Sequence, residues 1–392
     1  MRKKRYFYIF LSTICVGTFF GALLQKLSND RIPFDRTRVD RRVSTKFGDN
    51  RTKLILLYTQ WFTSPWPGIK DNEEGVQDTS GNICPVSNCR ITTAKGNFRA
   101  SDAVIFHGVM TPHEVTSGEL FKYKPKDQKW VWYEHENPVK MSNNYDVAAL
   151  DNMIDITISY KRNSTIFVPY GYYVTKDEIN KEDTNYAKDK AVGALWFVSN
   201  CWPKLRLQVA MKLAKYFPVH VFGDCAWPYF YWTPNRCPKG EPVCKSELNS
   251  KYKFYLAFEN YNCQDYISEK YWHTLIRTNM VPILIAGVYN KELLIPGSYI
   301  DVLDFPGPKT LANYLHYLNS NDTAYNEYFR WRSKYEVRLW PKDWICKLCE
   351  ILHSNHTNPP IHDFSQFWGI KENCYANDTY IYYKWLLDRS DT

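Results

Sequence analysis

The sequence lacks several motifs by which proteins commonly bind phosphate groups. It contains no Asp-x-Asp pair, no glycine-rich Walker loop and no GxGxxG. Without Asp-x-Asp there is none of the acidic metal clamp that many sugar-nucleotide enzymes use, and the missing glycine-rich loops disfavour a kinase or a dinucleotide enzyme. A diphosphate would therefore have to be stabilised by cationic side chains and helix ends, with no resident metal.

Excess positive charge is scarce beyond the N-terminus. The formal charge of +9 suggests nucleic acid at first, but residues 1–51 hold twelve Lys/Arg and four Asp. The remaining chain carries a net charge of only +1, so we expect no nucleic-acid partner. At 392 residues, 44% of them hydrophobic, the chain is long for one core and predicts two domains.

The N-terminal charges flank an apolar run without a charged residue, from Tyr6 to Leu24. A helix of that length spans about 28 Å, close to the thickness of a bilayer core. A cleavable signal peptide is the alternative, although its apolar run is usually shorter. We expect a cytoplasmic tail over 1–5, a signal anchor over 6–24, a polar stem over 25–51 and a lumenal remainder.

Two further features favour a secretory compartment. Ten of eleven cysteines lie beyond the anchor, an even number that suits disulfides. Five Asn-x-Ser/Thr triplets are candidate N-glycosylation sites: Asn50, Asn163, Asn321, Asn355 and Asn377. The pair Cys346-x-x-Cys349 favours structural disulfides, with zinc, ligated also by His353 and His356, or a redox pair as alternatives.

Short apolar runs followed by alternating strand and helix patterns predict an α/β protein. We expect strands at 53–59, 102–108, 129–138, 154–160 and 165–171 in a first domain over 52–185. The charged stretch 176–190 marks the boundary. A second domain over 186–350 should have strands at 193–201, 219–223, 253–260 and 281–287 and helices at 203–217, 265–277 and 307–318. Residues 351–392 would form a tail packing back on the catalytic domain.

In the second domain, "FENYNCQDYISEK" joins a buried strand to a helix, which is where open parallel sheets bind ligands. A helix start attracts phosphate, and Lys270 adds a positive charge. Further polar groups could bond sugar or base: Glu259, Asn260, Tyr266 and Glu269. This predicts a nucleotide-sugar pocket, the alternative being an ordinary helix capped by Asp265 with solvated charges.

A second junction of the same kind is "FVSNCWPKLR", where Ser199 and Asn200 end a strand and Arg206 begins a helix. Arg206 could grip a diphosphate with two hydrogen bonds, or it could be a surface arginine of an amphipathic helix. In the first domain, the strand "WVWYEHENP" ends in Glu134, His135 and Glu136. A carboxylate there, its pKa raised by burial, would suit a general base, and the residues alone do not choose among the three.

The segment "FYLAFENYNCQDYISEKYWHTLIRTNMVPILIAG" resembles the signature of inverting α1,3-fucosyltransferases that use GDP-fucose. "FVSNCWPKLR", "DAVIFH", "WVWYEHENP" and the late Cys-x-x-Cys also resemble that family, from about Lys53 to Cys349. With a cysteine at position 263, inside this signature, the chain resembles the invertebrate core-type members of the family more than the Lewis-type members. The resemblance implies a GT-B fold, with two Rossmann-like domains whose parallel sheets face a cleft.

The resemblance also implies roles. Glu136 would be the general base; Arg206 and Lys270 would neutralise the departing GDP; and the other donor-binding positions would be Asn260, Tyr266, Glu269, Ser199 and Asn200. Cys84 and Cys89 would pair with Cys346 and Cys349. No cofactor or metal is required, and stimulation by a divalent cation such as Mn²⁺ is left open.

Together with the predicted anchor, the resemblance implies a Golgi membrane enzyme, single-pass and type II, that transfers fucose to O3 of a GlcNAc in a glycoprotein N-glycan, with the core GlcNAc favoured. A Lewis-type enzyme acting on antennal N-acetyllactosamine is the alternative acceptor assignment. The alternative from outside the enzymes is an inactive lumenal glycan-binding relative. Such a protein would not need a general base opposite cationic side chains that bind a diphosphate.

Overall fold

The computed structural model describes residues 51–70, 75–178, 184–226, 230, 237, 242–286, 290–354, 359–374, 378–381 and 385–386. Within these ranges no helix is long and apolar enough to cross a membrane. The anchor predicted over 6–24 and the stem over 25–51, apart from Arg51, lie outside them.

The first domain is built on a six-stranded sheet in the order β2-β1-β3-β4-β5-β6, in which every pairing is parallel. Its strands are β1 (Lys53–Leu57), β2 (Cys89–Thr92), β3 (Ala103–His107), β4 (Lys129–Glu134), β5 (Ile156–Ser159) and β6 (Ile166–Phe167). In β4, Trp130 and Trp132 pack on one face while Val131 and Tyr133 pack on the other. The central strand is therefore covered on both faces, which explains its continuous apolar sequence.

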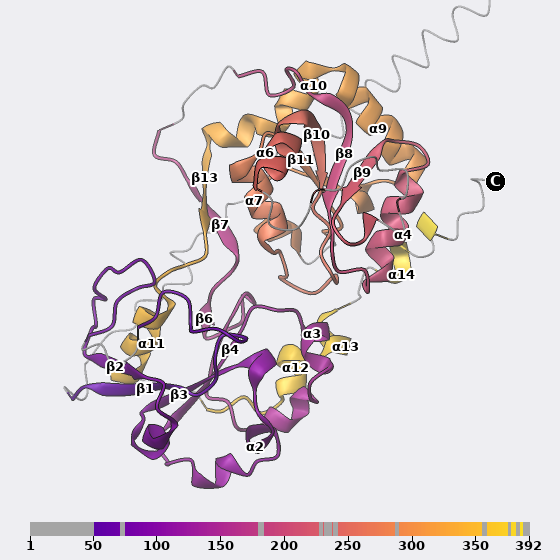
Figure 1. Cartoon of the computed structure of the whole chain (residues 1–392). Coiled ribbons are helices and arrows are strands. Elements are labelled where there is room, and N and C mark those ends of the chain that lie inside the picture. Colours follow the sequence, from indigo (N-terminus) through magenta and orange to yellow (C-terminus); the bar gives the residue numbers. More distant parts are fainter. Residues whose placement is uncertain are drawn as a thin grey trace, which may run out of the picture.

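The second domain has a five-stranded parallel sheet in the order β12-β11-β10-β8-β9. Its strands are β8 (Ala191–Phe197), β9 (Val219–Phe222), β10 (Tyr252–Leu256), β11 (Val281–Leu284) and β12 (Ile300–Asp301). Between the domains, β7 (Gly171–Thr175) pairs antiparallel with β13 (Tyr335–Leu339), and this ribbon is visible in Figure 1. Two Rossmann-like domains with parallel sheets are the fold class that the sequence predicts.

Helices cover both sheets (Figure 1). The α-helices are α2 (His113–Thr116), α3 (Pro138–Ser142), α4 (Lys204–Leu213), α6 (Pro242–Lys251), α7 (Glu269–Arg277), α9 (Pro308–Ser320), α10 (Asp322–Asn326), α11 (Trp344–His353), α12 (Phe364–Trp368), α13 (Ile370–Asn373) and α14 (Asp378–Ile381). The 3₁₀ helices are Lys95–Ala100, Gly108–Met110, Leu120–Tyr123, Val147–Leu150, Lys291–Leu293, Val302–Asp304 and Glu327–Ser333.

One detail of the predicted organisation needs correction. Helix α11 begins within the range predicted for the second domain, but its Trp344 and Leu348 pack in the apolar cluster of the first sheet. The chain therefore returns to the first domain after β13. The tail then contacts both domains, since Phe364 packs in the first and Trp385 in the second. Sequence patterns could not reveal this return, because helix periodicity does not say which sheet a helix covers.

Candidate active site

Glu134 ends strand β4 and is fully buried. Its Oε1 accepts hydrogen bonds from the backbone N–H groups of His135 and Glu136, both at 2.7 Å. Its Oε2 accepts another from Val109 at 2.7 Å. A Cβ on Gly108 would lie 2.6 Å from the same Oε2 and 2.8 Å from the rigid ring of Trp132, so this position requires glycine. Glu134 is thus committed to holding the strand end and is not free to meet a substrate.

Burial raises the pKa of Glu134 to about 8, even though three N–H groups favour its charged form. The Nε2 atom of His107 lies 3.8 Å from Oε1 of Glu134. Burial lowers the pKa of His107 to about 4 and that of His135 to about 3. Near neutral pH this buried cluster is therefore uncharged.

The protonated state of Glu134 predicts a pH dependence of stability. Folded Glu134 keeps its proton up to about pH 8, whereas a free carboxyl loses it near 4.5, so the folded state binds more protons in between. The free energy of unfolding should then fall as pH rises through this window. At pH 6.5 an unfolded histidine is half protonated and opposes this fall, whereas near pH 7.5 it is mostly neutral, and the contribution of Glu134 to the fall should then be about 1 kcal/mol per pH unit.

Urea unfolding of the wild type and of Glu134→Gln across that pH range measures the effect. The variant lacks the titrating carboxyl but keeps both histidines, so the stability of the wild type should fall relative to that of the variant as pH rises toward 8. Parallel curves would show that Glu134 is already ionised at pH 6.5.

Glu136 lies two residues beyond Glu134 and is only half-buried. Burial raises its pKa, while the charges of Lys270 and Lys140 act to lower it. Glu269 and Glu259 of the second domain are also close enough to raise the pKa of Glu136. A partly exposed carboxylate held by a rigid strand end, facing a cation of the other domain, has the properties of a general base. The structure therefore separates the neighbouring glutamates: Glu134 is structural and Glu136 is accessible.

Across from Glu136, helix α7 begins at Glu269 with Ser268 as its N-cap, whose hydroxyl accepts from Lys270 N–H. Glu259 accepts from the backbone N–H of Ser268 at 2.7 Å and from its hydroxyl at 2.8 Å. The alternative in which Asp265 caps the helix is wrong. Asp265 instead accepts hydrogen bonds from Arg162. The predicted helix start at 265 was four residues early, although a serine directly before Glu-Lys is itself a cap signal.

Lys270 is held at this helix start by carboxylates. Its Nζ lies 3.0 Å from Glu259 and 3.3 Å from Glu269, and it donates to the Ser268 hydroxyl at 2.7 Å. Although burial lowers the pKa of Lys270, the charges of Glu259, Tyr266 and Glu269 outweigh it and the net shift is upward. Lys270 is therefore a permanent cation.

Arg206, on the first turn of α4, is only 4% exposed, so the alternative of a surface arginine is wrong. Its Nη1 donates to Phe258 O at 3.3 Å and its Nη2 to Asn200 O at 2.5 Å. Its Nε is buried without a hydrogen-bond partner. Burial lowers the pKa of Arg206, and the nearby Glu259 raises it. A buried guanidinium bonded only to carbonyls, with one donor unused, is suited to receive an anion.

The other predicted donor-binding residues differ in burial and in their contacts. Tyr266 is buried, and its pKa, raised first by burial, is also affected by the charges of Lys270, Glu259 and Glu136. Ser199 and Asn200 flank the loop before α4; the Asn200 side chain accepts from Trp202 N–H at 3.2 Å, and the Ser199 hydroxyl from Asp224 N–H at 3.4 Å. Asn260 is half-buried next to Glu259.

A cavity of about 1040 Å³ begins at Glu269 and Lys270 and follows helix α7 to Asn279. Phe197 of β8 and Tyr255 of β10 form part of its lining. Its volume is of the size that holds small-molecule ligands. Glu269 and Lys270 border this cavity, but Arg206, Tyr266 and Glu136 do not line it, so the cavity along α7 is not the predicted donor pocket.

The disulfides include the pairing that the resemblance implies: Cys84 bonds Cys346, and Cys89 bonds Cys349. Cys346 and Cys349 are each bonded to a cysteine outside the Cys-x-x-Cys motif, so in this structure the motif forms neither a zinc site nor an internal redox pair. His353 does lie near Cys89 and Cys349, but it hydrogen-bonds Asn88 O. Two more disulfides join Cys201 to Cys225 and Cys263 to Cys374. Their connectivity could not be read from the sequence, because it depends on which loops meet in space.

Two of the candidate glycosylation sites fall on described residues. Asn163 is exposed in the loop after β5. Asn321 is half-buried, caps α10 through its side-chain oxygen and donates through Nδ2 to the hydroxyl of Tyr317. The other three, Asn50, Asn355 and Asn377, lie outside the described residues.

Comparison with known proteins identifies the family. A family model described as "Glycosyltransferase family 10 (fucosyltransferase) C-term" matches residues 187–367, and one described as "Fucosyltransferase, N-terminal" matches 50–171. The chain belongs to glycosyltransferase family 10, the fucosyltransferase family.

Curated relatives agree with that assignment. The chain is 33% identical over 313 residues to glycoprotein 3-alpha-L-fucosyltransferase A of Drosophila melanogaster, covering 78% of this chain and 57% of the relative. It is 28% identical to alpha-(1,3)-fucosyltransferase fut-1 of Caenorhabditis elegans, with 78% and 66% covered. It is 33% identical to 4-galactosyl-N-acetylglucosaminide 3-alpha-L-fucosyltransferase FUT5 of Gorilla gorilla gorilla, with 76% and 75% covered. The chain thus spans less than two thirds of the fly and worm proteins.

Among solved structures, that of an α1,3-fucosyltransferase with GDP-fucose matches with a TM-score of 0.42 and 16% identity. It covers 78% of this chain and 85% of the other.

Proposed function

We propose that the protein transfers L-fucose from GDP-fucose, with inversion, to O3 of a GlcNAc in a glycoprotein N-glycan, and that the core GlcNAc is the favoured acceptor. The observation that carries the proposal is the placement of Glu136 at the end of β4 against Lys270 at the start of α7, with Arg206 buried nearby. A carboxylate of the first domain thus lies within electrostatic range of Lys270 of the second. Arg206 and Lys270 both have Glu259 as a neighbour, so the two cations lie on the same side of the site, as stabilisation of a diphosphate requires.

In this mechanism Glu136 takes the proton from the acceptor O3 as that oxygen attacks C1 of fucose. The bond between C1 and the GDP oxygen breaks on the opposite face, which inverts the configuration. The negative charge that develops on GDP is stabilised by Arg206 and Lys270. The fixed N-terminal end of α7 contributes its positive dipole. Tyr266, Glu269, Asn260, Ser199 and Asn200 line the donor side of the same site.

The test is transfer from GDP-fucose by the full chain in detergent to defined N-glycans and N-acetyllactosamine acceptors, read by mass spectrometry with linkage analysis. A deoxyhexose on O3 of the core GlcNAc supports the proposal as stated. Addition to an antennal GlcNAc supports the Lewis-type alternative, the acceptor that the name of the gorilla relative describes. If GDP binds and no acceptor gains mass, the inactive glycan-binding alternative gains support.

We also propose that no metal is required. Among the described residues, the one group spaced to hold a metal ion is Cys89, Cys349 and His353, whose cysteines are oxidised. Treatment with EDTA is therefore expected to change the transfer rate by no more than about twofold, because cationic side chains replace the metal. Loss of transfer in EDTA that Mn²⁺ restores would contradict this, whereas stimulation by Mn²⁺ above an active metal-free baseline would not.

A Golgi address with a type II anchor over residues 6–24 is also proposed. It is supported by the uncharged run itself and by the disulfides of the described residues, which suit an oxidising compartment. Protease protection of the domain in intact Golgi vesicles, lost on adding detergent, is the expected result.

A further inference from the structure

The loop 259–268 belongs to the second domain by sequence, because it joins β10 to α7, but it packs on the first. Cys263 and Tyr266 lie in the apolar cluster that contains Trp130 and Trp368. The ring of Tyr266 is 5.0 Å from that of Tyr160. The segment that leads directly into Ser268 and Lys270 is thus in contact with the acceptor-side domain.

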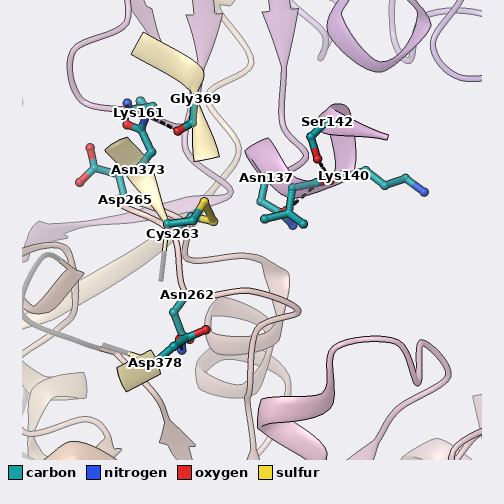
Figure 2. The surroundings of a disulfide bond; sticks show 12 residues. Asn137, Lys140, Ser142, Lys161, Asn262, Cys263, Asp265, Gly369, Asn373 and Asp378 are labelled. Carbon is teal, nitrogen blue, oxygen red and sulfur yellow. Dashed lines mark hydrogen bonds between the residues drawn. A yellow bond between two sulfur atoms is a disulfide. The ribbon is translucent and has the colours of Figure 1, made fainter. Parts of the chain in front are cut away.

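A disulfide strengthens this contact. Cys263 is bonded to Cys374, which directly follows α13 in the tail, and both cysteines are buried. Figure 2 shows the surroundings of this bond. Gln264 N–H also donates to Asn373 O at 2.7 Å. The loop is therefore held to the tail by one covalent bond and one backbone hydrogen bond.

The tail at this point is in turn fixed to the first domain. Lys161, in the loop after β5, is buried and donates to the side chain of Asn373 and to Phe367 O. Asn373 donates to Gly369 O at 2.8 Å, closing the turn between α12 and α13 (Figure 2). The disulfide consequently connects loop 259–268 to the first-domain core and not to a free tail.

A second, independent connection lies beside the first. Asp265 accepts from the backbone N–H of Arg162 and from its Nε, each at 3.0 Å. Asp265 adopts a left-handed φ of 60°, which is uncommon for a residue other than glycine and needs surrounding structure to maintain it. Its own N–H donates to Asn290 at 2.7 Å. Asp265 therefore ties Arg162 of the first domain to the second.

We propose that the Cys263–Cys374 disulfide and the Asp265–Arg162 pair are positioning groups, which hold the start of α7 at a fixed distance from Glu136. Catalysis by a base and a cation on different domains depends on their relative placement, and errors of about 1 Å can cost about a hundredfold in rate. This inference rests on the proposed function. GDP binding depends on Arg206 and Lys270 within one domain, so it should not need the connection.

The experiment compares Cys263→Ala/Cys374→Ala with Cys84→Ala/Cys346→Ala in the full chain. The control also removes a long-range disulfide, but one that joins two segments of the first-domain cluster. We expect kcat to fall about tenfold or more in the first variant only, because only it loses the alignment. The fall in kcat should exceed any rise in the KM for GDP-fucose, because Arg206 and Lys270 stay together in one domain and only the loop that carries Asn260 and Tyr266 is released.

Arg162→Met tests the second connection without touching a cysteine, and it should lower kcat in the same direction. If both variants keep the kcat of the wild type, or if KM rises while kcat is unchanged, the positioning role is wrong.

Hydrogen–deuterium exchange tests the positioning role independently of whether the protein transfers fucose. Even without fucose transfer, amides of 259–268 should lose protection in Cys263→Ala/Cys374→Ala while those of β10 keep it. Unchanged protection of 259–268 would overturn the inference by itself. If the wild type transfers no fucose and the variant still loses protection over 259–268, the connection stands and the proposed activity is rejected.

Discussion

Glu136→Gln is expected to lower kcat for fucose transfer by about a thousandfold, within the usual range for loss of a general base. The amide keeps the size of the side chain but cannot accept the proton of the acceptor hydroxyl. The affinity for GDP should stay within about threefold of the wild type, because Glu136 belongs to the other domain from Arg206 and Lys270. Steady-state kinetics with radiolabelled GDP-fucose and calorimetric titration with GDP measure the two effects.

Glu119→Gln is the matched control, since this glutamate is exposed on the same domain. It should transfer fucose at the rate of the wild type. Glu136 would not be the general base if Glu136→Gln transferred fucose at a near-normal rate while Glu134→Gln folded and bound GDP but was inactive. In that case Glu134 would have to reach the acceptor in spite of its burial.

The activity of the wild type should also fall as pH is lowered, because Glu136 must be ionised to act as a base. Burial raises its pKa, so the fall should begin at a higher pH than for a free glutamate.

Arg206→Met is expected to weaken GDP binding by about a hundredfold, which corresponds to about 2.7 kcal/mol and to the loss of one or two charge-assisted hydrogen bonds. In the structure the guanidinium is buried and has no carboxylate hydrogen-bonded to it, although Glu259 is close enough to raise its pKa. Methionine fills the same space without that charge. The stability of the GDP-free protein should therefore change little, because the lost carbonyl contacts are offset by relief from a buried charge.

Thermal unfolding with and without GDP measures both parts of this prediction. GDP should raise the Tm of the wild type and of the control Lys212→Met, which changes a lysine near the end of the same helix. It should raise the Tm of Arg206→Met far less at the same concentration. An equal rise in all three proteins would show that Arg206 does not contact the diphosphate.

The sequence alone predicts those strands and helices that have a strong pattern of apolar residues. Strands β1, β3, β4 and β5 follow from short apolar runs, and α9 follows from helical periodicity. The edge strand β2 and the pair β7 and β13 were missed, because an edge or a two-stranded ribbon leaves a weaker apolar pattern. β13 in particular has alternating half-buried and exposed residues.

For the candidate site, the sequence alone predicts where the proposed functional groups lie: at the ends of β4, β8 and β10, with the proposed base on the first domain and the proposed phosphate-binding cations on the second. Strand ends and helix starts are local features, and the family resemblance adds their roles. That Glu134 is enclosed while Glu136 is accessible follows from folding, because burial depends on residues such as Gly108 and Val109 that are distant in the chain. The disulfide between Cys263 and Cys374 is likewise a tertiary result, since two loops separated by 111 residues meet only when both domains are folded.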